Sequence, residues 1–110
     1  MNDRPVIEHL TEVKLHGDYA TKEVMAKCDS GSESTSIHYD LIVEIGGAER
    51  LGQREVYSAL GSEKRDTVQT SIELAGKRFD TKVDIGDRSG MDHKVLIGCD
   101  ILKNFLIAVT

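Results

Sequence analysis

The chain has 110 residues, which suits one domain with its own core, and its net charge of -5 and pI near 5.3 argue against a nucleic-acid partner, which needs a basic face. No segment reaches the roughly 20 apolar residues of a membrane span, and the N-terminal residues lack the layout of a signal peptide. We therefore expect a single domain over residues 1–110, a cytoplasmic location, and no contact with membranes or nucleic acids.

The first predicted elements form a β-hairpin that leads to an acidic turn. Polar and apolar residues alternate over Thr11–Leu15, Gly17-Asp18 is typical of a turn, and Glu23–Cys28 again favours a strand. Asp29 follows directly, so the sequence places a carboxylate at the end of a strand.

The next segment predicts another strand pair. Leu41–Ile45 is rich in branched apolar residues, which favours a strand, and Gly46-Gly47 predicts a hairpin turn. A further strand is expected to run through Val56.

A second hairpin is marked by strict alternation. Its expected strands are Val68–Leu74 and Phe79–Ile85, joined by a turn at residues 75–77. Because each strand has one apolar face, the register of this hairpin is expected to be well fixed. Short β-type stretches separated by glycines predict an all-β fold.

The C-terminal part predicts a buried strand, a short helix and a last strand. Val95–Ile97 is apolar at every position, as in a strand buried on both faces, and Gly98 ends it. Asp100–Asn104 favours a short helix, and Phe105–Val109 an apolar closing strand. An exposed apolar edge needs a partner, so we expect this last strand to pair across a dimer interface.

One triplet stands out as a candidate for chemistry. Asp29-Ser30-Gly31 places a carboxylate, a hydroxyl and a glycine in a tight turn, which can aim the acid outward. Such triplets also occur in turns that have no catalytic role, so the triplet alone leaves both interpretations open.

The chain resembles the retroviral-type, or retropepsin-like, aspartic proteases at two separate places. AKCDSGS and VLIGCDIL match that family in order and approximate spacing, and TSIELAGKRFDTKVDIG between them is similar to the hairpin that follows the family's flap. The likeness covers roughly residues 20 to 110. It is closer still to the putative ATP-dependent zinc proteases associated with ATP-grasp glutamate ligases, which share patterns similar to VMAKCDSGSESTSIH and DRSGMDHKVLIGCDILKNFLIAV.

The resemblance implies an acid protease barrel, here with one short C-terminal helix, that works as a homodimer. Asp29 would be catalytic, because the mechanism needs two close carboxylates that share a proton and one chain offers one such motif. Ser30 and Gly31 would shape the active-site loop, with Ser30 bonding across the dimer axis. The supporting strand beneath the loop would comprise Val95, Leu96, Ile97 and Gly98.

The flap that covers substrate is expected between about Arg54 and Thr67. Leu60, Gly61 and Ser62 lie near its expected tip. A solvated hairpin loop is the alternative interpretation of this segment.

Three functions remain open on the sequence. The first is an aspartic endopeptidase that needs no cofactor or metal and acts on peptides or proteins, glutamate-rich ones included. The second is an inactive peptide-binding or scaffold domain of the same fold, which the unusual neighbours Cys28 and Glu33 favour. The third is a zinc hydrolase, although the four histidines show no ligand spacing and H-E-x-x-H is missing.

Overall fold

The computed structural model describes residues 4–46 and 49–108, which form strands and two short helices. No helix among these residues is long and apolar enough to cross a membrane. In chain order the elements are β1 (Val6–Glu8), β2 (Leu10–His16), β3 (Thr21–Cys28), β4 (Ser36–His38), α1 (Tyr39–Glu44), β5 (Glu49–Ser58), β6 (Gly61–Leu74), β7 (Lys77–Gly86), β8 (Val95–Ile97), α2 (Cys99–Leu102) and β9 (Leu106–Ala108).

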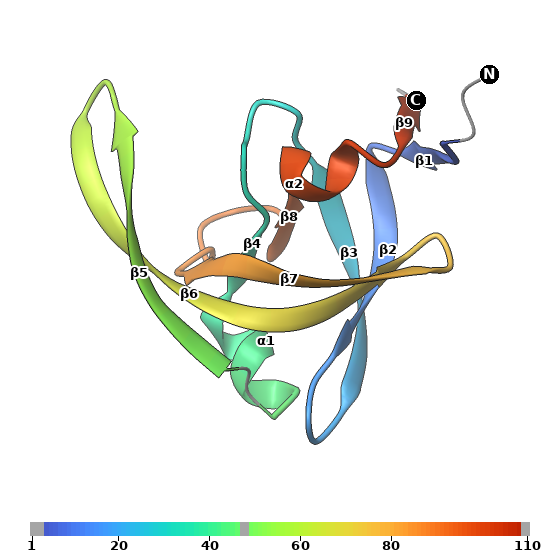
Figure 1. The fold of residues 1–110 in the computed structure, drawn as a ribbon, viewed down its shortest axis with the longest axis horizontal. Helices are drawn as coiled ribbons and strands as arrows, with labels where there is room; N and C mark the ends of the chain where they lie inside the picture. Colours follow the sequence, from blue (N-terminus) through green and yellow to red (C-terminus); the bar gives the residue numbers. More distant parts are fainter. Residues whose placement is uncertain (1–3, 47–48, 109–110) are drawn as a thin grey trace.

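Six of the strands form a closed barrel. They pair in the order β2-β3-β8-β4-β7-β6, and β6 pairs again with β2, which closes the ring. β5 continues the sheet on the other side of β6, and the hairpin of these two strands projects from the barrel (Figure 1). The predicted all-β barrel is confirmed.

Every strand of the ring contributes to a buried apolar core. Apolar side chains from one face of each strand point inward, as alternation requires, and both helices add to them. The ring strands supply Val13, Leu15, Ala26, Ile37, Val68, Ile72, Leu74, Val83, Val95 and Ile97, and the helices supply Leu41, Ile42, Ile101 and Leu102.

The two predicted hairpins are confirmed. β2 pairs with β3 in one continuous antiparallel register, and β6 pairs with β7 up to the Leu74–Lys77 pair. The second turn is therefore only Ala75-Gly76, and both residues have positive φ, 52° and 75°. Two positive φ values in a two-residue turn define the type I′ geometry, which matches the twist of the flanking strands.

The strand predicted over residues 41–45 is wrong, because this segment lies in and directly after α1. Leu41 and Ile45 lie one helical turn apart, and both are buried, so the apolar run serves a helix face. The prediction of a hairpin turn at Gly46-Gly47 is also wrong for Gly46, the residue of this pair that the structure describes. Gly46 has φ 94° and ends α1 in the left-handed conformation, whereas Gly47 lies outside the described residues.

The C-terminal elements agree with the sequence. β8 lies between β3, to which it is parallel, and β4, to which it is antiparallel, and Val95 and Ile97 are fully buried. The predicted helix is present as α2 and begins one residue earlier, at Cys99.

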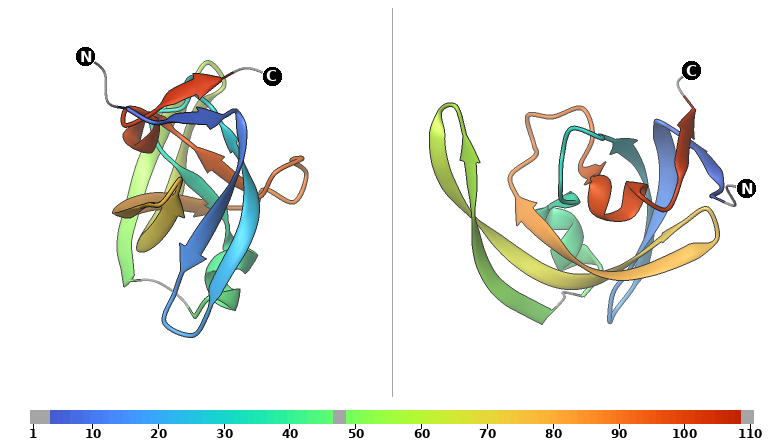
Figure 2. Two further views of the ribbon diagram at one scale, coloured as in Figure 1. Left: turned by 90° about the vertical axis from the view of Figure 1, so that its right-hand side faces the viewer. Right: turned by 45° about the horizontal axis from the view of Figure 1, so that its top comes forward.

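β9 pairs in parallel with β1 of the same chain. These two strands form a separate small sheet at one end of the molecule (Figure 2). The prediction that the last strand pairs with a partner chain is therefore wrong for the edge of β9 that pairs with β1. Val6 and Leu106 are register partners in this sheet, and both are exposed.

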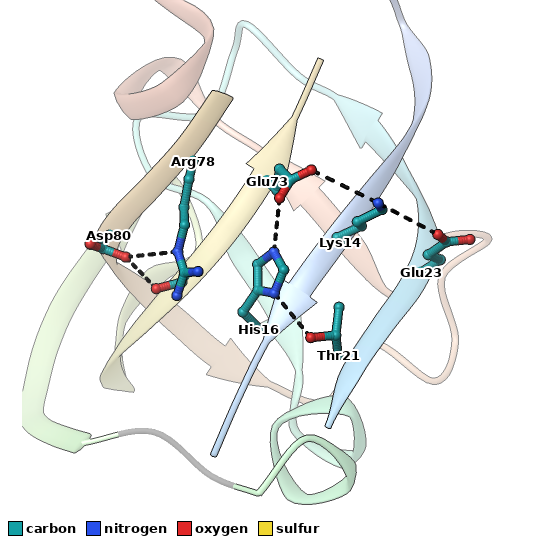
Figure 3. A network of polar contacts seen from close by, with 8 residues as sticks. Lys14, His16, Thr21, Glu23, Glu73, Arg78 and Asp80 are labelled. Atoms are coloured by element: carbon teal, nitrogen blue, oxygen red, sulfur yellow. Dashed lines mark hydrogen bonds and ion pairs between the residues drawn. The ribbon is translucent and has the colours of Figure 1, made fainter. Parts of the chain in front are cut away.

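A polar network lies at the seam where β2 meets β3 and β6 (Figure 3). The His16 ring bonds Thr21 Oγ1 through Nδ1 at 3.0 Å and Glu73 Oε1 through Nε2 at 3.1 Å. Lys14 Nζ lies 3.9 Å from carboxylate oxygens of both Glu23 and Glu73. Side chains from all three strands therefore bridge the join that closes the barrel.

Candidate functional site

Asp29 lies in a tight turn at the end of β3. Its backbone N–H donates to the Ile97 carbonyl at 2.9 Å, which continues the pairing with β8 by one residue. The Gly31 N–H donates to Asp29 Oδ1 at 2.9 Å, and the Ser32 N–H donates to the Asp29 carbonyl at 3.1 Å. One carboxylate oxygen is thus fixed by the turn, while the half-buried side chain keeps its other oxygen available.

The N-terminus of α2 holds the loop that follows Asp29. The backbone N–H of Cys99 donates to the Ser32 carbonyl at 2.8 Å, and that of Asp100 donates to the Glu33 carbonyl at 3.1 Å. The Cys99 thiol also lies 3.1 Å from the Ser30 carbonyl. Two distant segments of the sequence therefore form one rigid unit around Asp29.

Hydrogen bonds between Thr35 and Asp100 join the Asp29 loop to α2. Thr35 is fully buried, and its N–H and hydroxyl both donate to the Asp100 carboxylate, at 3.1 and 2.8 Å. The Gly98 N–H in turn donates to Thr35 Oγ1 at 3.2 Å. A Cβ at Gly98 would lie 2.5 Å from backbone atoms of Ser34, so only glycine fits at this crossing.

The predicted supporting strand lies directly beside Asp29. β8 supplies the carbonyl that binds the Asp29 N–H, and Gly98 begins the contacts with the loop. The structure thus brings Asp29, Ser30, Gly31 and the strand Val95–Gly98 together. Ser30 and Gly31 are both exposed on the loop.

A hollow of about 520 Å³ opens beside Asp29. It carries charged groups of both signs together with apolar side chains. Its lining consists of Leu10, Lys27, Asp29, Arg88, Met91, Asp92, His93 and Leu96.

The loop between β7 and β8 forms one wall of this hollow and is anchored to a buried histidine. The Arg88 N–H donates to His38 Nδ1 at 2.8 Å, and Arg88 Nε donates to the His93 carbonyl at 3.1 Å. Asp87 caps the start of the loop, where hydrogen bonds from the Ser89 hydroxyl and N–H lower the pKa of the Asp87 carboxyl. The sequence identified none of these residues as part of a site, because the loop offers only ordinary polar residues.

The predicted flap tip lies at the far end of the β5–β6 hairpin. Ser58 pairs with Gly61, so residues 59 and 60 form the turn; Leu60 is fully exposed, and Gly61 has φ 120°. Figure 2 shows this hairpin arching away from the barrel. A second hollow, of about 440 Å³, lies between the β6 half of the hairpin and residues 85–91.

Both cysteines lie close to the acid, Cys28 next to Asp29 in the chain and Cys99 against Ser30. Among the residues whose side chains the structure describes, no group of three or more His, Cys, Asp or Glu is placed to hold a metal ion. Cys28 and Cys99 are both free thiols, and partial burial raises the pKa of Cys28.

No protein-family model and no curated protein matches the chain. Solved structures do match. A Legionella pneumophila protein of unknown function has a TM-score of 0.63 and 18% identity, over 96% of this chain and 92% of that one. The simian foamy virus protease has a TM-score of 0.62 and 14% identity, over 86% and 91% of the two chains.

The protease of EIAV, solved with a bound inhibitor, has a TM-score of 0.67 and 16% identity, over 94% of this chain and 88% of that one. At such identities the likeness establishes the fold alone. The chain therefore has the barrel fold found in retroviral proteases.

Proposed function

We propose that the protein is an aspartic endopeptidase that acts as a homodimer, in which each copy supplies one Asp29. The observation that carries this proposal is the Asp29 turn itself: Gly31 holds one carboxylate oxygen, and the side chain lines a hollow. Two of the matching structures with this fold are proteases.

The chemistry follows from two carboxylates placed close together. Like charges at short range share one proton, so one Asp29 is ionised and its counterpart is protonated. The ionised carboxylate takes a proton from a water molecule, whose oxygen attacks the peptide carbonyl carbon. The protonated carboxyl gives its proton to the carbonyl oxygen, which yields a tetrahedral diol. The carboxyl that took the proton from water then passes it to the peptide nitrogen, the C–N bond breaks, and the other carboxylate takes back the proton of the diol hydroxyl.

Features of the loop and of the terminal sheet support a dimer. Among the described residues no group of the same chain bonds the Ser30 hydroxyl, which is exposed and free to bond across the dimer axis. Within the described part of the chain, the β1–β9 sheet has two strands and carries exposed Val6 and Leu106, so its outer edges could pair with a second copy.

The substrate in this proposal is a peptide or protein segment that lies between Asp29 and the β5–β6 hairpin. Leu60, Gly61 and Ser62 would then cover it and exclude water. The likeness of the sequence to putative ATP-dependent zinc proteases that accompany glutamate ligases extends the proposal to glutamate-rich peptides. The comparisons lend no support to that narrower likeness.

The test compares wild type with Asp29→Asn on a diverse peptide library, at several pH values from acid to neutral, with and without a chelator. Asparagine keeps an oxygen that can accept the Gly31 N–H, so the turn is preserved while the acid is removed. Cleavage that disappears in the variant and ignores the chelator supports the aspartic mechanism. Cleavage that the chelator abolishes supports a zinc hydrolase instead.

Mixing the two proteins tests whether the active unit contains both copies of Asp29. If subunits exchange freely, equal amounts leave roughly a quarter of the dimers with two acids, so activity falls below that of simple dilution. Activity that falls only in proportion to the wild-type content would contradict a shared site. A folded dimer that binds peptides without cleaving them would favour the binding-module alternative.

A further inference from the structure

Arg88 lies in the wall that the two hollows share. The hollow beside Asp29 and the hollow along β6 have only Arg88 and Met91 in common among their lining residues. A peptide that runs from Asp29 toward the β5–β6 hairpin would therefore pass the Arg88 side chain.

The Arg88 side chain is held in place by its own loop and by a buried ring. His38, whose side chain is only 3% exposed, accepts the Arg88 N–H at Nδ1, so its own proton sits on Nε2, 3.3 Å from Asp40 Oδ2. Arg88 Nε donates to the His93 carbonyl, which fixes the plane of the guanidinium. Its two terminal nitrogens have no bonded partner among the described residues.

The electrostatic surroundings of Arg88 leave it short of negative charge. Burial and the neighbouring Arg65 lower the pKa of Arg88, whereas Asp29 raises it. Arg65 has its own carboxylate, Glu63, at 2.6 Å, but no carboxylate of the described chain lies within ion-pair distance of Arg88. A half-buried guanidinium without a carboxylate partner binds an added carboxylate favourably, through two parallel hydrogen bonds.

We infer that Arg88 is a specificity-determining residue that binds a carboxylate side chain of the peptide next to the bond at Asp29. This inference takes its substrate, a peptide, from the proposed function. Two observations support it: the terminal nitrogens of Arg88 are unbonded within the described part of the chain, and Arg88 lies between the two hollows. Lys27 adds a second positive charge to the lining of the Asp29 hollow, and exposed Asp92 adds a negative one. The favoured substrate class is therefore a peptide with an acidic residue beside the cleaved bond.

The test measures binding of fluorescein-labelled octapeptides that differ at one central residue, which is Glu, Gln or Lys. Binding is measured in the Asp29→Asn protein by fluorescence anisotropy, so cleavage does not interfere. The Glu peptide is expected to bind about tenfold tighter than the Gln peptide, the typical effect of one charge-assisted pair. Adding Arg88→Gln should abolish the preference, and adding Arg88→Glu should turn it toward the Lys peptide.

Arg78→Gln is the matched control. Arg78 is exposed on β7, pairs with Asp80 and lies outside both hollows, so its loss changes net charge equally but should keep the Glu preference. Arg88→Lys keeps the charge but loses the fork, and should weaken the preference without removing it. Circular dichroism of each variant checks that the barrel is intact.

Equal affinity for the three peptides, absence of binding, or a Glu preference that survives Arg88→Gln would overturn the inference. Cleavage of the same peptides by the protein with Asp29 intact separates the two proposals. An Arg88-dependent Glu preference without cleavage keeps the inference and rejects the peptidase. Cleavage at equal rates for Glu and Gln keeps the peptidase and rejects the role of Arg88.

Discussion

Replacing Asp100 by alanine should destabilise the whole barrel, because it removes the acceptor that holds Thr35. Both donors of the fully buried Thr35, its N–H and its hydroxyl, bond the Asp100 carboxylate. The N–H of Ile101 also donates to this carboxylate but keeps the Gly98 carbonyl at 3.1 Å. The loss therefore concerns two hydrogen bonds.

Each hydrogen bond to a charged acceptor contributes about 1.5–3 kcal/mol, so the loss of two in Asp100→Ala should lower the free energy of unfolding by about 3–6 kcal/mol. That is a large part of the roughly 5–15 kcal/mol available to a domain. Asp100→Asn should cost less, since its oxygen still accepts the Thr35 hydroxyl while its NH₂ group faces the Thr35 N–H. Only one of the two bonds is then lost.

Urea unfolding followed by far-ultraviolet circular dichroism measures this effect, because the chain has no tryptophan for fluorescence. Asp18→Ala, at an exposed position in the β2–β3 turn, is the control and should leave stability within about 0.5 kcal/mol of wild type. The reasoning is refuted if Asp100→Ala unfolds at the same urea concentration as the control with an unchanged slope.

Three further predictions follow from local geometry. Gly98→Ala should destabilise the protein by about 1–3 kcal/mol, because its Cβ would meet the Ser34 backbone; an unchanged urea midpoint would contradict the close approach. Ala75→Asn should stabilise by about 0.5–1 kcal/mol, since asparagine tolerates the left-handed φ of 52° better than alanine does, and a lower melting temperature would argue against the turn geometry. Iodoacetamide should modify exposed Cys99 faster than Cys28 near neutral pH, because the raised pKa of Cys28 leaves less thiolate, and mass spectrometry of the labelled peptides showing equal rates would reject this.

The hairpins were predictable because their information is local. Strict alternation over β6 and β7 fixes which face of each strand is buried, and the Ala75-Gly76 pair fixes the register. β8 also has a local signal, because Val95 and Ile97 are buried in the core and Leu96 on the other face is partly buried beside the Asp29 hollow.

α1 was not predictable in the same way. Leu41–Ile45 has the apolar density of a strand, and periodicity cannot separate a short strand from a short buried helix. The burial pattern separates the two. Leu41, Ile42 and Ile45 are buried while Val43 between them is exposed, which fits one face of a helix and not the alternation of a strand. The backbone of Ile45 also occupies the space that a side chain at Gly17 would need.

The candidate site was predictable only in its central residue. Asp29 stands out because of its residue types and the resemblance of the surrounding segments, and its catalytic role stays a prediction. The contacts that hold the surrounding loops could not be predicted from the sequence. The Thr35–Asp100 and His38–Arg88 hydrogen bonds join residues 65 and 50 positions apart, and no local pattern marks them. Long-range partners of this kind become evident only once the chain is folded.

The dependence of the Asp29 loop on α2 has a consequence for synthesis on the ribosome. The Cys99 thiol lies 69 residues further along the chain than Ser30, whose carbonyl it contacts, and the amide donors of α2 leave the ribosome together with Cys99. Contacts of such sequence separation form late, after most of the loop-closure entropy has been lost. A nascent chain would thus keep its acidic turn unformed until the segment around α2 has left the ribosome.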